Sequence, residues 1–322
     1  MRIGKKLAMI TLLTGMAIGL TACGKEAAKE KESEGKTKVV ATVFAEYDFL
    51  RNIAGDNIDL TMMMKPGGDL HSYEPSPKDM MAAQEADLFV TIGGESDAWS
   101  EKITDSIDSK KVKVVKLMDC VDVVEEELVE GMQEEEESEE EGGEEEKELD
   151  EHVWTAPKNA IKIVNKLSET LCSLDKEHAG LFKKNTKKYV KRLEELDKKF
   201  ADVIDHAKRK EIIVGDRFPF RYFADAYDLK YYAAFPGCSV NTGASAETIS
   251  FLVNKVKEDK IPVVFHMEMS NESICDVISS ETGAKKEQLN AVHNISKEDF
   301  TSGKGYLELM EENVSVLKEA LN

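Results

Sequence analysis

From Lys38 onward, short apolar runs alternate with segments in which apolar residues recur at helical spacing. Continuous apolar runs predict buried strands, and apolar residues three or four apart predict helices packed by one face. The predicted strands are 39–44, 58–64, 87–92, 112–117, 211–214, 230–235 and 261–265, with a last short strand end at 289–293. Because strands alternate with helices, we expect an α/β fold with parallel sheets covered by helices on both faces.

The longest helical pattern runs from His178 to Lys208, with no glycine or proline after Gly180. At 1.5 Å per residue, about 28 helical residues reach roughly 40 Å, which is longer than one lobe needs. We therefore expect two similar lobes, each with a parallel sheet flanked by helices, joined by one long rigid helix. The other predicted helices are 47–54, a segment capped by Ser76 with Pro77 at its first position, 158–167, 245–257, 272–282 and 306–321.

Negative charge is concentrated between Glu125 and Glu151, where seventeen acidic residues stand against one lysine. A block of like charges cannot pack into a core, so we expect a disordered acidic loop at 125–151. This run contributes −16 of the net charge of −20, which leaves an ordinary surface elsewhere. The chain lacks the basic face that phosphate binding needs, so nucleic acid is excluded as a partner.

The N-terminus has the features of a targeting segment. Basic residues precede an apolar run at 7–20. The run leads into the sequence Leu-Thr-Ala-Cys, whose last residue is Cys23. This pattern predicts a lipoprotein signal peptide at 1–22 and a lipidated Cys23 at the start of a charged tether, 23–37. The alternative is a plain signal peptide with an incidental cysteine. We expect a lipid-anchored protein on the extracytoplasmic face of a bacterial membrane.

Four further cysteines contain no C-x-x-C pair, so a thiolate zinc site is poorly supported. An extracellular setting permits disulfides, and Cys238 with Cys275 is the first pair to test. Buried free thiols are the alternative. The other two cysteines are Cys120 and Cys172.

Polar groups able to bind metal follow the predicted strands in both halves of the chain. In open parallel sheets, ligands bind at the carboxyl ends of the strands. Imidazole is the commonest nitrogen ligand for a metal ion. Only two histidines, His178 and His206, lie on the long helix, where exposure is the simpler explanation. The candidates at strand ends are His71, His152, Asp216, His266, Glu268 and His293.

Two motifs resemble those of the zinc/manganese substrate-binding lipoproteins of ABC importers, the ZnuA/TroA-like family. They are His71-Ser-Tyr-Glu-Pro-Ser-Pro-Lys-Asp79 and Asp150-Glu-His-Val-Trp-Thr-Ala-Pro157. The resemblance covers roughly Lys38 to Asn322 and implies one metal ion held between two lobes. It carries the first two histidine ligands to His71 and His152.

The remaining family ligands carry over less simply. The third position falls on Arg217, which stays protonated and cannot bind a cation. The fourth, an aspartate in the family, falls on His293. Glu268, Asp216, His266 or a water could fill the gap. We therefore take His71, His152, His293 and Glu268 as the candidate ligands. Such a set favours Zn²⁺ over Mn²⁺, because manganese prefers more carboxylate oxygens.

The resemblance predicts a monomeric binding lipoprotein that captures Zn²⁺ and delivers it to an ABC permease with a separate ATPase subunit. The expected domains are a metal-binding lobe at 38–177, a connecting helix at 178–210 and a second lobe at 211–322. We expect no enzyme, since H-E-x-x-H, G-x-S-x-G and P-loop motifs are lacking. The alternatives are a Mn²⁺ carrier, a zinc-dependent hydrolase and a metal-stabilised surface adhesin. The acidic loop either attracts cations or is a solvated linker.

Overall fold

The computed structural model describes residues 35–68, 73–94, 98–133, 148–239 and 243–322. Residues Thr37–Asn322 make up one compact unit. It contains two four-stranded sheets in which every pair of neighbouring strands is parallel. The strands are β1 Thr37–Ala41, β2 Ile58–Met62, β3 Leu88–Thr91, β4 Lys113–Lys116, β5 Glu211–Phe218, β6 Lys230–Pro236, β7 Val263–Met267 and β8 Lys285–Leu289.

The two sheets repeat one topology, because their strand orders are β2-β1-β3-β4 and β6-β5-β7-β8. In each sheet the connections reverse direction between the first strand and the third. This reversal leaves a crevice at the carboxyl ends of the two central strands, where ligands bind in open α/β sheets. In the second sheet the central strands are β5 and β7, so the residues at their ends are placed at a binding position by topology.

Helices connect the strands and cover the sheets, as the alternating pattern predicts. They are α2 Phe44–Ala54, α3 Pro77–Gln84, α4 Ala98–Ser106, α5 Pro157–Leu174, α6 Ala179–Asp205, α7 Arg221–Tyr227, α8 Ala246–Asp259, α9 Ser273–Thr282, α10 Lys297–Ser302 and α11 Tyr306–Leu321, with short 3₁₀ turns η1 Gly55–Asn57, η2 Met118–Cys120 and η3 Val153–Thr155. Ser76 and Ser245 cap α3 and α8 through their hydroxyl groups, as their positions in the sequence predict. Helices α4, α7 and α10 are short, and the hydrophobic pattern missed them.

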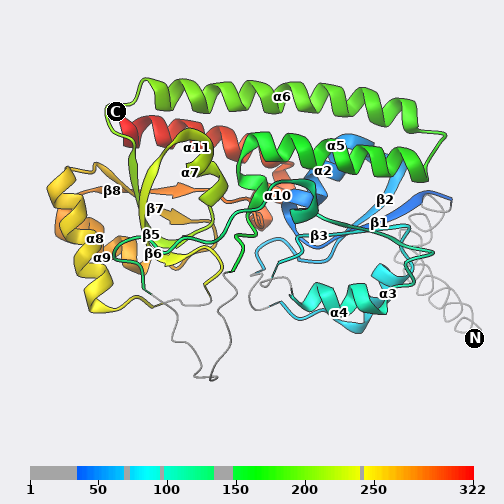
Figure 1. The fold of residues 1–322 in the computed structure, drawn as a ribbon, viewed down its shortest axis with the longest axis horizontal. Coiled ribbons are helices and arrows are strands. Elements are labelled where there is room, and N and C mark those ends of the chain that lie inside the picture. The colour runs from blue at the N-terminus through cyan, green and yellow to red at the C-terminus, as the bar shows by residue number, and fades with distance from the viewer. Residues whose placement is uncertain (1–34, 69–72, 95–97, 134–147, 240–242) are drawn as a thin grey trace, which may run out of the picture. The chain divides into compact units, whose positions relative to one another are not determined.

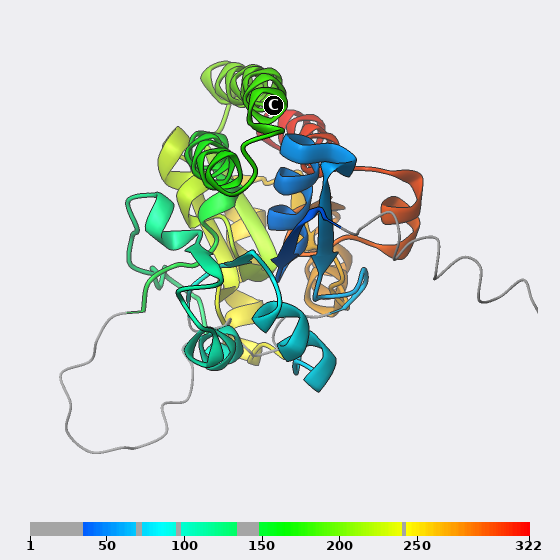
Figure 2. The same ribbon diagram turned by 90° about the vertical axis from the view of Figure 1, so that its right-hand side faces the viewer.

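The long helix α6 has 27 residues and packs against α5, α2 and α11. Figure 1 and Figure 2 show it above α5 and α11, running past both sheets. Its buried face is a stripe at helical spacing that includes Phe182, Leu193, Leu196 and Phe200. These side chains belong to one hydrophobic cluster that also contains residues of both sheets, such as Val39 and Val214. Helix α6 therefore ties the two halves through a shared apolar core.

The strand boundaries differ from the sequence prediction where the site lies. Strand β5 continues to Phe218, past Val214, where the sequence predicts its end. A register shift between Val214 and Arg217 interrupts its pairing with β6 and re-aims the intervening side chains. The strand end predicted at 289–293 is wrong, because β8 stops at Leu289 and the following residues are irregular.

Several predictions fall on residues outside the described ranges. These are the signal peptide at 1–22, Cys23 and His71. The domain boundaries at 177 and 210 stay predictions. No helix in the described part of the chain combines the length and apolarity needed to cross a bilayer.

The four described cysteines are free thiols, so the pairing of Cys238 with Cys275 is wrong and the alternative of free thiols holds. Cys275 is buried, and its Sγ lies 3.0 Å from the Phe265 carbonyl oxygen, to which it donates. Cys238 lies instead on the loop after β6, where its amide donates to the Glu126 carboxylate.

Candidate metal centre

His152 lies on a tight turn directly before η3. Its carbonyl accepts hydrogen bonds from the Thr155 amide and from the Thr155 hydroxyl, so the chain reverses within one 3₁₀ turn. Asp150 Oδ1 accepts from the His152 amide at 2.8 Å and lies 3.1 Å from the ring Nδ1. With Nδ1 as the donor, the lone pair is on Nε2, which is the form that binds a metal. The local sequence thus sets both the position and the tautomer of the imidazole.

Trp154 joins this turn to the second half of the chain. Its indole Nε1 donates to the Ala291 carbonyl at 2.7 Å, and its own carbonyl accepts from the Tyr306 hydroxyl at 2.7 Å. The side chain is fully buried, so both bonds form away from water. Ala291 stands two residues before His293, and the clamp brings that histidine beside His152. The two imidazole centroids are 4.5 Å apart.

The segment that carries His293 is held in a strained conformation. Val292 has φ = 60°, a region that β-branched residues rarely adopt. The Glu268 carboxylate accepts from the Ala291 amide at 2.7 Å and from the His293 amide at 3.1 Å, on either side of Val292. The His293 carbonyl in turn accepts from the Phe44 amide at the start of α2. These bonds fix the backbone at His293 from both halves of the chain.

Both carboxylate oxygens of Glu268 therefore accept hydrogen bonds from backbone amides. Burial raises the pKa of this carboxyl to about 7, although the amides of Ala291 and His293 act in the opposite direction. The two amides thus occupy about half of the lone-pair sites of this carboxylate. The contacts give Glu268 the geometry of a residue that positions His293.

Negative charge surrounds the buried His152. Burial alone would lower the pKa of its imidazole, but the carboxylates of Asp150, Glu151 and Glu126 outweigh burial and raise the pKa above its usual range. Asp150 Oδ2 is buried and has no hydrogen-bond partner in the described part of the chain. Burying an unpaired carboxylate oxygen is costly, and a nearby cation offsets that cost. The surroundings of His152 thus favour positive charge at this point.

Cys238 lies near the same carboxylates but is not a good metal ligand. Burial and the charges of Glu151, Glu126 and Asp150 raise the pKa of its thiol well above the usual range. A metal binds the thiolate, which is scarce under these conditions. Cys238 therefore stays a protonated thiol at neutral pH.

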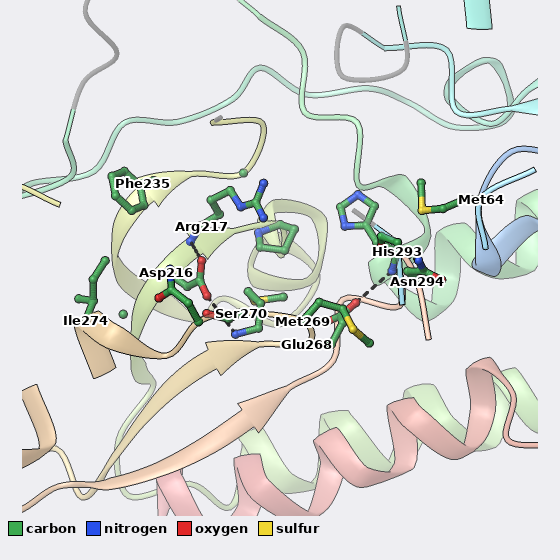
Figure 3. Close-up of a pocket in the computed structure, with 16 residues that line it drawn as sticks. Met64, Asp216, Arg217, Phe235, Glu268, Met269, Ser270, Ile274, His293 and Asn294 are labelled. Carbon is green, nitrogen blue, oxygen red and sulfur yellow. Dashed lines mark hydrogen bonds between the residues drawn. The ribbon is translucent and has the colours of Figure 1, made fainter. Parts of the chain in front are cut away.

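A cavity of about 210 Å³ opens beside the two histidines at the carboxyl ends of β5 and β7. Figure 3 shows Asp216 and Arg217 on the β5 side of this cavity and Glu268 and His293 on the other. Gly237 also lines it, and a Cβ at Gly237 would lie 3.1 Å from His152 Cε1. The remaining lining residues are Met64, Gly68, Gly215, Pro219, Phe235, Met267, Met269, Ser270, Asn271, Ile274 and Asn294.

The structure brings together some of the predicted site residues and separates others. His293, Glu268 and Asp216 line the cavity, and the buried His152 lies behind its wall with its ring centroid 4.5 Å from that of His293. The His266 ring lies against the Met267 carbonyl and does not line the cavity. Asp216 accepts from the Arg217 and Met267 amides. The described ranges contain no group of three or more His, Cys, Asp or Glu side chains placed to hold a metal, and His71 lies outside them.

Sequence reasoning missed Asp150, Trp154 and the positioning role of Glu268. Asp150 and Trp154 stand two residues on either side of His152 in the quoted motif, which is a signal that could have marked them. No local signal marks Glu268 as the partner of the 291–293 backbone.

The two ends of the acidic run are ordered, which the prediction of a disordered loop at 125–151 did not anticipate. Glu125 and Leu149 form an antiparallel bridge, and the Gln133 amide donates to the Ala234 carbonyl. Carboxylates in these ends have partners: Glu126 accepts from the Cys238 amide and Glu127 pairs with Arg221. Backbone pairing and these donors outweigh the repulsion that the like charges create. The middle of the run, 134–147, lies outside the described residues.

Residues 39–320 match the ZnuA family, described as zinc-uptake complex component A, periplasmic. The chain belongs to this family. It is 32% identical over 315 residues to the zinc-binding lipoprotein AdcA of Streptococcus pneumoniae (strain ATCC BAA-255 / R6), covering 98% of this chain and 61% of AdcA. It is also 32% identical over 320 residues to the high-affinity zinc uptake system protein ZnuA of Bacillus subtilis (strain 168), covering 98% of each chain. The chain thus spans less than two thirds of AdcA but nearly all of that ZnuA.

Solved structures of this ZnuA-family group have the same fold. The Zn(II)-bound ZnuA-like domain of Streptococcus pneumoniae AdcA superposes with a TM-score of 0.72 at 30% identity, over 89% of this chain and 99% of that domain. The metal-dependent lipoprotein YcdH of Bacillus subtilis superposes with a TM-score of 0.74 at 29% identity, over 89% and 100% of the two chains. The family and the α/β fold predicted from the sequence are confirmed. The relatives are zinc-binding transport proteins and not enzymes, so the hydrolase alternative is dropped.

Proposed function

We propose that this ZnuA-family chain captures one Zn²⁺ between its two halves, with His152 and His293 as ligands. The observation that carries the proposal is the face-to-edge approach of these two imidazoles beside a cavity, with Asp150 behind His152. The zinc-binding relatives support zinc as the cargo. Two imidazoles suit zinc better than manganese, which prefers carboxylate oxygens.

The role of each residue follows from its contacts. His152 offers Nε2, because Asp150 holds Nδ1. His293 is fixed through its backbone by Glu268, so we assign Glu268 to positioning. His71 is a further ligand by its place in the family motif. Arg217 occupies the third ligand position of the family motif, and its guanidinium cannot bind a cation.

We further propose that the chain works outside the cytoplasmic membrane and passes zinc to an ABC permease that is driven by a separate ATPase. The family of periplasmic uptake components supports this place and these partners. We expect a monomer anchored through a lipid on Cys23. Replacing Cys23 with Ala should release the protein from salt-washed membranes, as judged by fractionation and immunoblotting. Retention of Cys23→Ala in the membrane with its signal peptide cleaved would contradict the anchor.

Zinc binding by the purified full chain tests the central claim. After chelator stripping, zinc at a thousandfold excess over Kd should stabilise the fold by about 4 kcal/mol, because only the folded state holds the site. Calorimetric titration should give one tight site. A melting temperature that zinc leaves unchanged would refute the proposal.

Alanine variants locate the site. His152→Ala and His293→Ala should each weaken zinc binding by well over tenfold, since loss even of a residue that supports a ligand costs ~10–100-fold. His178→Ala is the matched control, because His178 pairs with Asp175 in the way that His152 pairs with Asp150 but at the far end of α5. Equal effects of all three variants would point to a general loss of stability.

A further inference from the structure

The cavity beside His152 and His293 is larger than one metal ion needs. Its volume is about 210 Å³, whereas a cavity of ~10–15 Å³ by the same measure already holds one water molecule. It is smaller than the ~300–1,000 Å³ of pockets for drug-sized ligands. The space therefore suits a small organic molecule beside the metal.

Arg217 gives this cavity a fixed positive charge. Its side chain lines the cavity, and the guanidinium donates one hydrogen bond within the described residues, from Nη1 to the Ser239 carbonyl at 3.4 Å. No carboxylate of the described chain forms an ion pair with it. A guanidinium has five N–H donors in a planar fork that matches a carboxylate. Most of these donors stay available to a ligand.

Among the described residues, the acidic groups on the same wall bond to backbone amides and not to the Arg217 guanidinium. Asp216 Oδ1 accepts from the Arg217 amide and Oδ2 from the Met267 amide. The Glu268 carboxylate accepts from the amides of Ala291 and His293. Ser270 and Asn271 add neutral polar groups to the lining.

The metal itself also requires a further ligand. Zinc in proteins is almost always four-coordinate, and the described residues contribute two imidazoles and no third group in reach. Even one more imidazole from the chain would leave a tetrahedral position for a molecule from outside. An oxygen ligand at that position could belong to the molecule that fills the cavity.

We propose that this site takes zinc as a complex with a small chelator that carries at least two carboxylates, one of which binds the metal and another of which binds Arg217. The inference rests on the proposed function, because it needs zinc at His152 and His293. The chelator supplies the missing oxygen, and Arg217 holds the chelator.

The experiment uses the stripped full chain with zinc and radiolabelled citrate or L-malate in equal amounts. After gel filtration the wild-type chain should retain zinc and one of these acids at one equivalent each. Arg217→Met should lose the acid at least tenfold more than it loses zinc, because methionine keeps length but not charge. Arg217→Lys should retain part of the acid, since a point charge replaces the fork. Arg192→Met is the matched control, because Arg192 pairs with Glu308 away from the cavity.

The outcomes separate this inference from the function on which it rests. Zinc bound without either acid, or acid retained equally by wild type and Arg217→Met, overturns the inference alone. No zinc bound in any condition overturns the proposed function as well. If Arg217→Met fails to fold, a loss of the melting transition will show it, and Arg217→Lys then decides between the two results.

Discussion

The carboxylate behind His152 offers the sharpest test of how this centre works. Asp150 Oδ1 accepts from the His152 amide and faces Nδ1, while Oδ2 is buried without a partner in the described structure. Asp150→Asn keeps the shape and the acceptor oxygen but removes the charge. The imidazole should keep its place and lose basicity at Nε2, because a charged acceptor polarises the ring more than an amide does.

The expected magnitude follows from the role of such carboxylates. Loss of a group that orients and polarises a metal-bound histidine costs ~10–100-fold in affinity, or about 1.4–2.7 kcal/mol. Asp150→Asn should lie near tenfold and Asp150→Ala near 100-fold, since alanine also releases the ring. Stability without metal should change little in Asp150→Asn at pH 8, because the amide oxygen of asparagine can still accept from the His152 amide. The assays are competitive zinc titration and thermal melting of the stripped protein.

Asp175→Asn provides the control, because Asp175 also contacts the amide and Nδ1 of a histidine, His178, through Oδ1 and Oδ2 respectively. This variant should leave zinc affinity unchanged. An Asp150→Asn protein that binds zinc as tightly as the wild type would refute the polarising role. Equal weakening by both variants would show that the effect comes from stability and not from the ligand.

Four further outcomes are expected. Gly237→Ala should weaken zinc binding by titration, because the new Cβ would meet His152 and the Phe218 carbonyl, whereas Gly243→Ala has open space and should not. Zinc affinity should fall as the pH drops from above 6.5, because the carboxylates raise the pKa of His152 and protons then compete with the metal. The same raised pKa should stabilise the metal-free fold at a pH below the pKa of an unfolded histidine. That stabilisation should be lost as the pH rises through the pKa of His152 in the folded state. In the metal-free protein, the free energy of unfolding should fall as the pH rises from about 4.5 to 7, because the raised pKa of Glu268 makes the folded state bind an extra proton in this range. Glu268→Gln should flatten this slope in urea melts measured at several pH values. Replacing 134–147 with a short linker should leave calorimetric zinc affinity within a few-fold, because carboxylates in a flexible chain are weak ligands; weakening as great as that of His152→Ala would make the acidic run the binder.

The sequence by itself determined the secondary structure and the fold class. Continuous apolar runs marked seven strands of the two sheets, and a stripe at helical spacing marked α6 almost to its ends. Such patterns are local, because a strand or helix must bury one face wherever it lies. The sequence also placed His152 near the end of one half and His293 near the end of the other. The short helices α4, α7 and α10 were not predicted, because so few residues do not show a clear helical spacing of apolar positions.

Only the tertiary structure decided how these residues meet. Trp154 reaches Ala291 across 137 residues, and Glu268 braces the backbone on both sides of Val292. The order at the ends of the acidic run likewise depends on donors such as the Cys238 amide, which lies 112 residues from Glu126. No local pattern encodes contacts between such distant segments, because they form only when the packing of both sheets against α6 brings the segments together. The chemistry at Arg217 has the same origin: the residue type is readable in the chain, but its place on a cavity wall beside two imidazoles is a property of the fold.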